Sequence, residues 1–308
     1  MALTPDEAIL QEYPLEDYEA NRAACGYMEL VRVTRERTLT DGVQFRECLY
    51  RRGNGDDVWV YLTTIAPDAK AQLAVSAAPL RTIKMVKNHA KEFEEFFGIP
   101  VLYAMNASFF HFFNDGDLTP YGIQVMHGVE MAPPAGQDKA KPWYSHNFLA
   151  VDKEGRAFIC NSEEYYRTWR GKLSFAVGGG VRLIRDGKIF AHRNKVAGPR
   201  TVVGIAADGT VILMCADGRS SRSAGITYAD TIDLYTHLGY EIREVLNLDG
   251  GGSTTVVLKD EDGVHRVANI PSGPPLPVSY SKYGITRGEP EGETQARAVA
   301  DAVLIIPK

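Results

Sequence analysis

The stretch TVVGIAADGTVILMCADGR, residues 201–219, carries the clearest structural signal in the chain. Two apolar runs rich in β-branched residues flank Asp208-Gly209, and Asp-Gly between such runs is the strongest short signal for a β-hairpin. The same arrangement returns at Asp186-Gly187 inside SFAVGGGVRLIRDGKIF. Two hairpin signals so close together predict a largely antiparallel sheet.

Further strand-like runs lie upstream of these hairpins. VWVYLTTIA (58–66) and AQLAVSAA (71–78) are predicted to be neighbouring strands of a hairpin, because a Pro-Asp pair between them marks a turn. PVLYAMNASFF (100–110) is predicted to be a buried strand that runs into a loop. By contrast, residues 1–45 are charged and contain few strand-like runs, so we expect a helical or irregular N-terminal extension there.

Two segments show helical signals. From about residue 80 to 97, apolar residues recur every three or four positions, and Gly98 ends the pattern. The second helix is predicted from Tyr228 to Leu238, with Thr227 as N-cap and Asp230 at its third position. The fold class is therefore predicted to be α+β, a single domain of residues 46–308 with a mixed, largely antiparallel multi-stranded sheet and two main helices.

Composition restricts the class of protein. The chain has 308 residues, of which 44% are hydrophobic and 24% charged, as in ordinary globular proteins. A formal net charge of -5 argues against general affinity for nucleic acid. No apolar run approaches the roughly 20 residues of a membrane span, and the first residues are acidic where a signal peptide would be basic. On these grounds we expect a cytoplasmic protein without a membrane span.

The stretch NLDGGGSTT, residues 247–255, is the strongest candidate for a functional site. Asp249 follows an apolar run, and Gly250 and Gly251 permit positive φ and close approach of a ligand to the backbone. An ordinary turn, as at Asp208-Gly209, is the alternative. A turn needs only one or two glycines, so three glycines followed by Ser253 and Thr254 favour a polar pocket.

Other candidates are weaker when taken singly. Asp217 and Arg219 follow the strand-like run TVILM, and Arg200 precedes another. Arginine forks match phosphate geometry, although a solvated turn is the better explanation of Asp217 and Arg219 taken alone, and each arginine by itself is weak evidence. Asn106 lies beside two phenylalanines, which suits either a sugar site or an amide bonded to the backbone. The Gly178–Gly180 run is neither GxGxxG nor a P-loop, so a nucleotide fold is disfavoured.

These motifs occur together in an order that resembles the phosphodiester glycosidase family. The resemblance covers roughly residues 58 to 306, and NLDGGGSTT is its most specific element. It implies hydrolysis of a sugar-1-phosphodiester, releasing the sugar and leaving a phosphomonoester. Catalytic roles are implied for Asp249, Asp217, Arg200 and Arg219, and substrate-binding roles for Asn106, Ser108, Gly179, Gly180, Thr201, Gly250, Gly251, Ser253, Thr254 and Asn269.

The chemistry of these residues suggests a mechanism. Arg200 and Arg219 would hold the phosphodiester, with N–H groups of the glycine runs adding support. Asp249 or Asp217 would be the nucleophile or the base for water, an alternative that the sequence leaves open. Asn106, Ser253 and Thr254 would bind sugar hydroxyls or an acetamido group.

Three further expectations follow. The partner is a small-molecule or polysaccharide sugar-phosphate substrate rather than nucleic acid. No cofactor or metal ligand is predicted, and a divalent metal is left open. The competing hypothesis is a carbohydrate- or phosphate-binding module without turnover. Family members are commonly exported, which stands against the cytoplasmic location expected from the residues alone.

Overall fold

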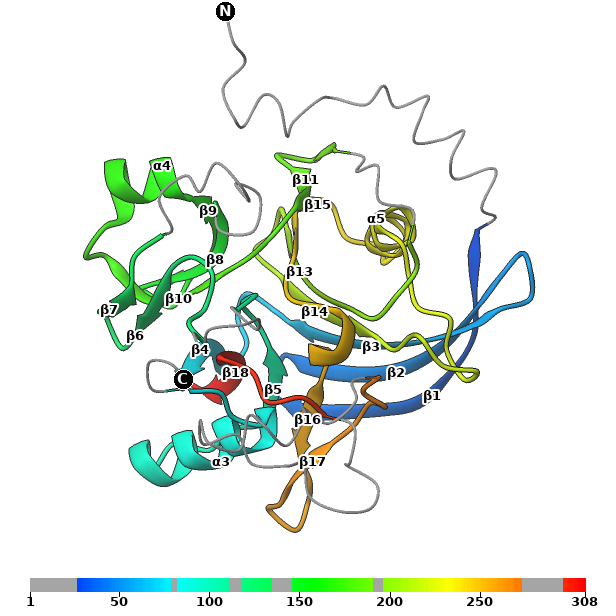
Figure 1. The fold of residues 1–308 in the computed structure, drawn as a ribbon, viewed down its shortest axis with the longest axis horizontal. Coiled ribbons are helices and arrows are strands. Elements are labelled where there is room, and N and C mark those ends of the chain that lie inside the picture. Colours follow the sequence, from blue (N-terminus) through cyan, green and yellow to red (C-terminus); the bar gives the residue numbers. More distant parts are fainter. Residues whose placement is uncertain (1–26, 79–81, 111–117, 135–145, 191–195, 273–295) are drawn as a thin grey trace, which may run out of the picture.

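The computed structural model describes residues 27–78, 82–110, 118–134, 146–190, 196–272 and 296–308 (Figure 1). These residues form three sheets, in which every pairing between named strands is antiparallel. Two α-helices of more than one turn are described, α3 (Val86–Phe97) and α5 (Tyr228–Thr236). The predicted α+β class, with its largely antiparallel strands and two main helices, is confirmed. None of the helices described is long and apolar enough to cross a membrane.

The largest sheet has eight strands and contains both predicted Asp-Gly hairpins. β13 pairs with β14 around Asp208-Gly209, and β11 pairs with β12 around Asp186-Gly187. In spatial order the sheet consists of β1 (Met28–Thr40), β2 (Val43–Arg52), β3 (Asp57–Ile65), β14 (Val211–Ala216), β13 (Arg200–Ala206), β15 (Ile242–Asn247), β11 (Arg182–Arg185) and β12 (Lys188–Ile189).

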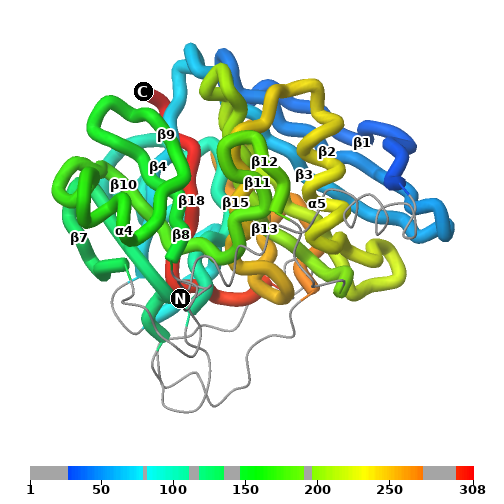
Figure 2. Tube along the Cα trace, turned by 90° about the horizontal axis from the view of Figure 1, so that it is seen from above, coloured from blue at the N-terminus to red at the C-terminus, as the bar shows by residue number. Residues whose placement is uncertain are grey.

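Two five-stranded sheets complete the fold. One consists of β17 (His265–Val267), β16 (Val256–Lys259), β5 (Tyr103–Asn106), β18 (Asp301–Pro307) and β4 (Ala71–Ala77). The other consists of β7 (Val129–Ala132), β6 (Gln124–Met126), β10 (Leu173–Gly178), β8 (Asn147–Asp152) and β9 (Ala157–Asn161), followed by the short α4 (Ser162–Glu164) and a π-helical turn (Tyr165–Trp169). Figures 1 and 2 place this last sheet at the opposite end of the molecule from β1 and β2.

The large sheet is covered on both faces. One face packs against the β17–β4 sheet, whose strands in turn contact α3, and the other face packs against α5 (Figure 1). Gly204 lets α5 approach, because a Cβ at this position would lie 2.2 Å from the ring of Tyr235. The Tyr235 hydroxyl then donates to the carbonyls of Val202 and Ile212 at 3.3 and 3.0 Å. Burial on both faces explains why these strands read as almost continuous apolar runs.

The predicted start of the second helix is confirmed. Thr227 is the N-cap of α5: its hydroxyl accepts from the Asp230 N–H at 3.1 Å, and the Asp230 carboxylate accepts from the Thr227 N–H at 2.7 Å. Such a capping box satisfies two backbone donors that the first turn leaves without partners. The first helix also ends as predicted, at Gly98 in the left-handed conformation with φ 66°.

Two expectations are corrected. The helical or irregular conformation expected for residues 1–45 is wrong where the structure describes that segment, because β1 and β2 are strands and β2 crosses residue 45. β1 is an edge strand with nearly all residues exposed, so it lacks the apolar alternation that marks a strand. Residues 1–26 lie outside the described residues, and the domain of residues 46–308 stays a prediction.

The second correction concerns the hairpin predicted from residues 58 to 78. β3 pairs with β2 and β14, whereas β4 pairs with β18 in a different sheet. The turn between them is present, but the chain crosses from one sheet to the facing one. A turn signal marks a change of direction and does not specify the partner strand.

Candidate functional site

The loop after β15 contains Asp249 and is fixed on both sides by backbone hydrogen bonds. The Asp249 N–H donates to the Ala107 carbonyl at 2.9 Å, and the Gly251 N–H donates to the Pro199 carbonyl at 2.9 Å. Gly251 has φ 62° and opens a short 3₁₀ turn, Gly251–Ser253. A Cβ on Gly250 would lie 2.7 Å from the Pro199 carbonyl oxygen. The glycines are therefore required by the tight passage of this loop between β5 and β13.

Asn106, at the end of β5, forms hydrogen bonds with this loop. Its Nδ2 donates to the Asp249 carbonyl at 2.6 Å, and its Oδ1 accepts from the Thr201 hydroxyl at 2.9 Å and the Thr255 N–H at 3.1 Å. The residue is fully buried. Of the two interpretations of Asn106, the structure favours an amide bonded within the protein over one open to a sugar.

Asp217, which follows β14, has an equally internal environment. Its carboxylate accepts from the Tyr61 hydroxyl at 3.0 Å, the Asn269 Nδ2 at 2.8 Å and the Ile270 N–H at 3.0 Å. It is 2% exposed. Burial raises the pKa of Asp217, and the hydrogen bonds from Asn269, Ile270 and Tyr61 oppose this rise. A carboxylate with three donors and almost no exposure is suited to joining loops.

The remaining polar residues of this layer bind one another. Asn269 also donates to the Thr254 carbonyl at 3.1 Å and accepts from the Val256 N–H at 2.7 Å, and the Thr201 hydroxyl lies 3.4 Å from that of Thr254. All are buried. We call Asn106, Thr201, Asp217, Thr254 and Asn269 the buried scaffold.

We predict that Asp217→Asn lowers the free energy of unfolding by about 2 kcal/mol or more, because an amide cannot accept hydrogen bonds at both of its positions and leaves a buried donor without a partner. Urea denaturation measures the change. Asp208→Asn is the control, since its exposed Asp-Gly turn tolerates Asn equally well. Full stability of Asp217→Asn would contradict its place in the scaffold.

Asp249 differs from the buried scaffold because the residue as a whole is only half-buried, although its carboxyl group is buried. Burial of its carboxyl group raises the pKa to about 7, while the Ser253 hydroxyl and the charge of Arg297 act in the opposite direction. Ser253 Oγ is itself buried and has no partner of regular hydrogen-bond geometry in the described part of the chain. A carboxyl group whose pKa is raised toward neutral pH by burial, beside a charged partner such as Arg297, is typical of a reacting group.

Two arginines face this loop. Arg219 is exposed and has φ 59°, a strained conformation for a residue other than glycine. Its guanidinium lies over Gly251, where Nη1 would be 3.2 Å from a Cβ. The charges of Arg219 and Asp249 both act on Arg297, whose pKa is lowered chiefly by burial. Arg219, Arg297 and Asp249 therefore form one charged cluster above the buried scaffold.

Arg200 does not join this cluster through its side chain. Residues alternate along β13, so Thr201 faces Asn106 whereas Arg200 faces α5. The Arg200 guanidinium lies 4.7 Å from the centre of the Tyr228 ring, and Nη2 donates to the Val196 carbonyl at 2.9 Å. The Arg200 guanidinium thus lies against Tyr228 and not over the Asp249 loop, and the joint binding of a phosphodiester by Arg200 and Arg219 stays a prediction.

The backbone N–H groups of Gly179 and Gly180 and the hydroxyl of Ser108 form hydrogen bonds within the protein. The N–H groups of Gly179 and Gly180 donate to the carbonyls of Asn147 and Asn247, each at 2.8 Å, so neither is available to an anion. A Cβ on Gly180 would lie 2.9 Å from the Phe109 ring. The Ser108 hydroxyl donates to the buried carboxylate of Asp301 at 2.8 Å.

Sequence reasoning missed Arg297 and Asp301, which lie in ARAVADAVLIIP. β18 begins in that segment, at Asp301. Both act on Asp249: Arg297 lowers its pKa, and Asp301 raises it. The sequence signal that could have identified them is a pair of opposite charges, Arg297 and Asp301, at the start of an apolar strand. No group of three or more His, Cys, Asp or Glu side chains is arranged to hold a metal ion within the described ranges.

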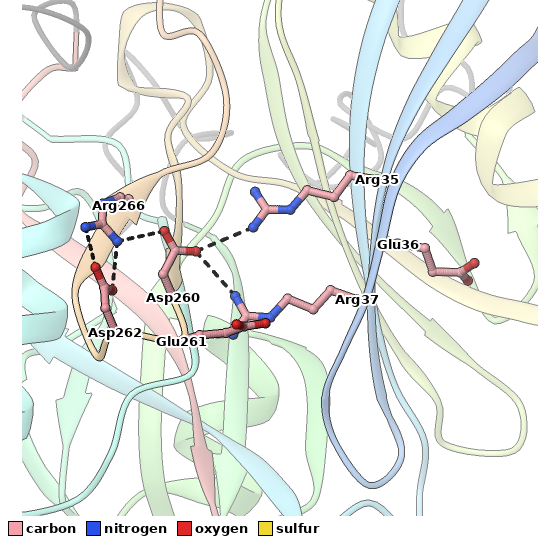
Figure 3. Close-up of a pocket in the computed structure, with 7 residues that line it drawn as sticks. All are labelled: Arg35, Glu36, Arg37, Asp260, Glu261, Asp262 and Arg266. Atoms are coloured by element: carbon pink, nitrogen blue, oxygen red, sulfur yellow. Dashed lines mark hydrogen bonds and ion pairs between the residues drawn. The ribbon is translucent and has the colours of Figure 1, made fainter.

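A charged hollow of about 510 Å³ lies elsewhere, between β1 and the turn that joins β16 to β17 (Figure 3). Asp260 accepts from Arg35 and Arg37 at 3.4 Å and from Arg266 at 2.9 Å, and Arg266 also binds Asp262 through two hydrogen bonds. Each of these arginines is thus paired with an aspartate. The ion pairs of Arg35 and Arg37 with Asp260 connect β1 of the large sheet to the turn after β16.

Comparisons with known proteins place the chain in a family. The sequence profile of the phosphodiester glycosidase family matches residues 100–306. The SPbeta prophage-derived uncharacterized protein YomE of Bacillus subtilis (strain 168) is 37% identical over 106 residues, which are 30% of this chain and 16% of that protein. The chain thus spans less than a fifth of the length of that relative.

Two solved structures share the fold. The catalytic domain of zebrafish N-acetylglucosamine-1-phosphodiester alpha-N-acetylglucosaminidase, auto-inhibited by its pro-peptide, has a TM-score of 0.59 at 16% identity, covering 98% of this chain and 93% of that one. A protein from Burkholderia pseudomallei K96243 has a TM-score of 0.52 at 14% identity, covering 82% and 74%. At such identities the likeness concerns the fold alone.

Proposed function

Because the chain belongs to the phosphodiester glycosidase family, we propose that it hydrolyses a sugar-1-phosphodiester, of the N-acetylglucosamine-1-phosphodiester type, at the anomeric C–O bond. The products would be the free sugar and a phosphomonoester. One observation carries the proposal: Asp249, a half-buried residue in the loop after β15, has a carboxyl pKa of about 7 and lies in the field of Arg297, which in turn lies in the field of Arg219.

The two arginines would bind the phosphodiester. Arg219 is exposed and Arg297 is partly exposed, so both can reach an anion above the loop. Guanidinium groups match phosphate oxygens in pairs and stabilise the charge that develops on the leaving phosphate. Positive charge therefore takes the place of a strong general acid at the leaving group.

Asp249 would act on the other side of the anomeric carbon. As a base it accepts a proton from water while the water oxygen bonds to that carbon, and the electrons of the breaking C–O bond pass to the phosphate oxygen. As a nucleophile it would form a glycosyl ester that water then cleaves. A pKa near 7 suits the base at neutral pH, and the anomer released, read by NMR, separates inversion from retention.

The deciding experiment incubates the purified protein with an aryl phosphodiester of N-acetylglucosamine-1-phosphate and follows free sugar, with and without EDTA. A panel of other sugar-1-phosphodiesters tests which sugar the protein accepts as part of its substrate. Binding without sugar release across the panel would favour the alternative, a carbohydrate- or phosphate-binding module.

The pH dependence tests the state of Asp249. We predict that kcat/KM rises with pH to a plateau, with a midpoint near pH 7, because the carboxyl group must be ionised to act. Well below the midpoint the rate should fall about tenfold per pH unit. Initial rates between pH 5 and 9 measure the curve, and a rate that falls as pH rises through 7 would instead make Asp249 an acid.

A further inference from the structure

We propose that Asp301 is a positioning residue of this site, whose buried negative charge adds to the effect of burial and moves the pH range in which Asp249 reacts upward. The kinetic part of this inference rests on the proposed function, whereas its electrostatic part does not. Nothing in the proposed reaction requires Asp301 to touch the substrate.

The first support is the connection between the two aspartates. Asp301 begins β18 and is fully buried, and the next residue, Ala302, pairs with Asn106 in β5. Its carboxylate accepts from the Ser108 N–H at 2.7 Å, while the adjacent Ala107 carbonyl accepts from the Asp249 N–H at 2.9 Å. Consecutive residues of one short segment therefore hold the two aspartates.

The second support is the set of donors around Asp301. Besides the Ser108 N–H, the Ser108 hydroxyl donates at 2.8 Å and the Gln124 Nε2 at 2.9 Å. Burial raises the pKa of Asp301, and these three hydrogen bonds oppose the rise by stabilising its anion. Since two of the donors are N–H groups that cannot accept, the arrangement favours the ionised form at neutral pH.

The third support is the balance of charge around Asp249. Arg297, from the segment before β18, and the hydroxyl of Ser253 favour the ionised form of Asp249, whereas Asp301 opposes its ionisation. The charge of Arg219, from the loop after β14, lowers the pKa of Arg297. Asp301 thus supplies the negative charge in this set. Its complete burial means that salt screens the effect little. Without it, Asp249 would ionise at lower pH under the influence of the arginines.

The experiment follows the Asp249 carboxyl carbon by NMR in protein labelled at aspartate, in wild type and Asp301→Asn. We expect the midpoint near pH 7 in wild type to fall by roughly one pH unit in the variant, a tenfold change in the ionisation constant. The rising limb of the pH–rate curve should move by the same amount. Because NMR needs no turnover, an inactive protein would refute the proposed function without deciding this inference.

Asp152→Asn is the matched control. Asp152 is also a buried carboxylate with three donors, the N–H groups of Glu154 and Arg156 and the Arg156 Nε, but it lies in β8, in a different sheet from Asp301. It should leave the Asp249 midpoint unchanged. An unmoved midpoint in Asp301→Asn, or an equal fall in Asp152→Asn, would overturn the proposal. If Asp301→Asn fails to fold, the wild-type spectrum still tests the proposal. An Asp301 carboxyl carbon with the chemical shift of a protonated acid at pH 7 would also overturn it.

Discussion

Asp249→Asn should lower the rate of sugar-1-phosphodiester hydrolysis by between about a hundredfold and ten-thousandfold, the usual contribution of a positioned acid or base. Asparagine has the size of aspartate but neither accepts a proton from water nor attacks carbon at a useful rate. Single-turnover sugar release measures the loss and separates it from weaker binding.

The same substitution should stabilise the protein at high pH. The Asp249 carboxyl group has a folded pKa of about 7, above the unfolded value of about 3.9, so the folded state binds the proton more tightly. The wild type therefore loses stability as pH rises from about 4 to 7 and regains none above it. At pH 8 we expect Asp249→Asn to be more stable by roughly 1–2 kcal/mol, less than the full 1.4 kcal/mol per pKa unit because the asparagine amide is itself a polar group that burial penalises.

Two comparisons make this prediction specific. Asp208→Asn changes the other Asp-Gly turn and should leave both rate and stability unchanged. Asp217→Asn should lose stability, in contrast to Asp249→Asn. If Asp249→Asn kept wild-type turnover, Asp249 would not be the reacting carboxylate, whatever its effect on stability.

Arg219→Ala should lower kcat/KM by about a hundredfold or more, as expected when one charged group that stabilises the developing phosphate is removed. Arg219→Lys should recover only part of the rate, because an ammonium group does not match two phosphate oxygens in the way a guanidinium does. Inhibition by inorganic phosphate should weaken in parallel, which gives a measurement independent of turnover.

The backbone of Arg219 offers an internal control. Its φ of 59° is costly for alanine and free for glycine. Arg219→Gly should therefore be as slow as Arg219→Ala but more stable, by about 1 kcal/mol. Arg200→Ala should reduce kcat/KM far less, because that side chain faces Tyr228 on the other side of β13. Equal losses in the two arginine variants would contradict the division of roles drawn from the geometry.

The sequence by itself determined the features that depend on neighbouring residues. The Asp208-Gly209 and Asp186-Gly187 hairpins, the capping box at Thr227 and the helix end at Gly98 form as predicted, because each is a local backbone preference. NLDGGGSTT is likewise a tight loop, since only glycine fits at Gly250 beside Pro199.

Only the tertiary structure decided which of the candidate residues lie together. It directed Arg200 and Thr201 to opposite faces of β13, enclosed Asn106 and Asp217 in hydrogen bonds, and paired β3 and β4 in separate sheets. It also brought Arg297 and Asp301 to Asp249 through the pairing of β18 with β5. The reason is physical: burial, strand partners and the field around a carboxyl group depend on residues far apart in the chain, and no local pattern records them.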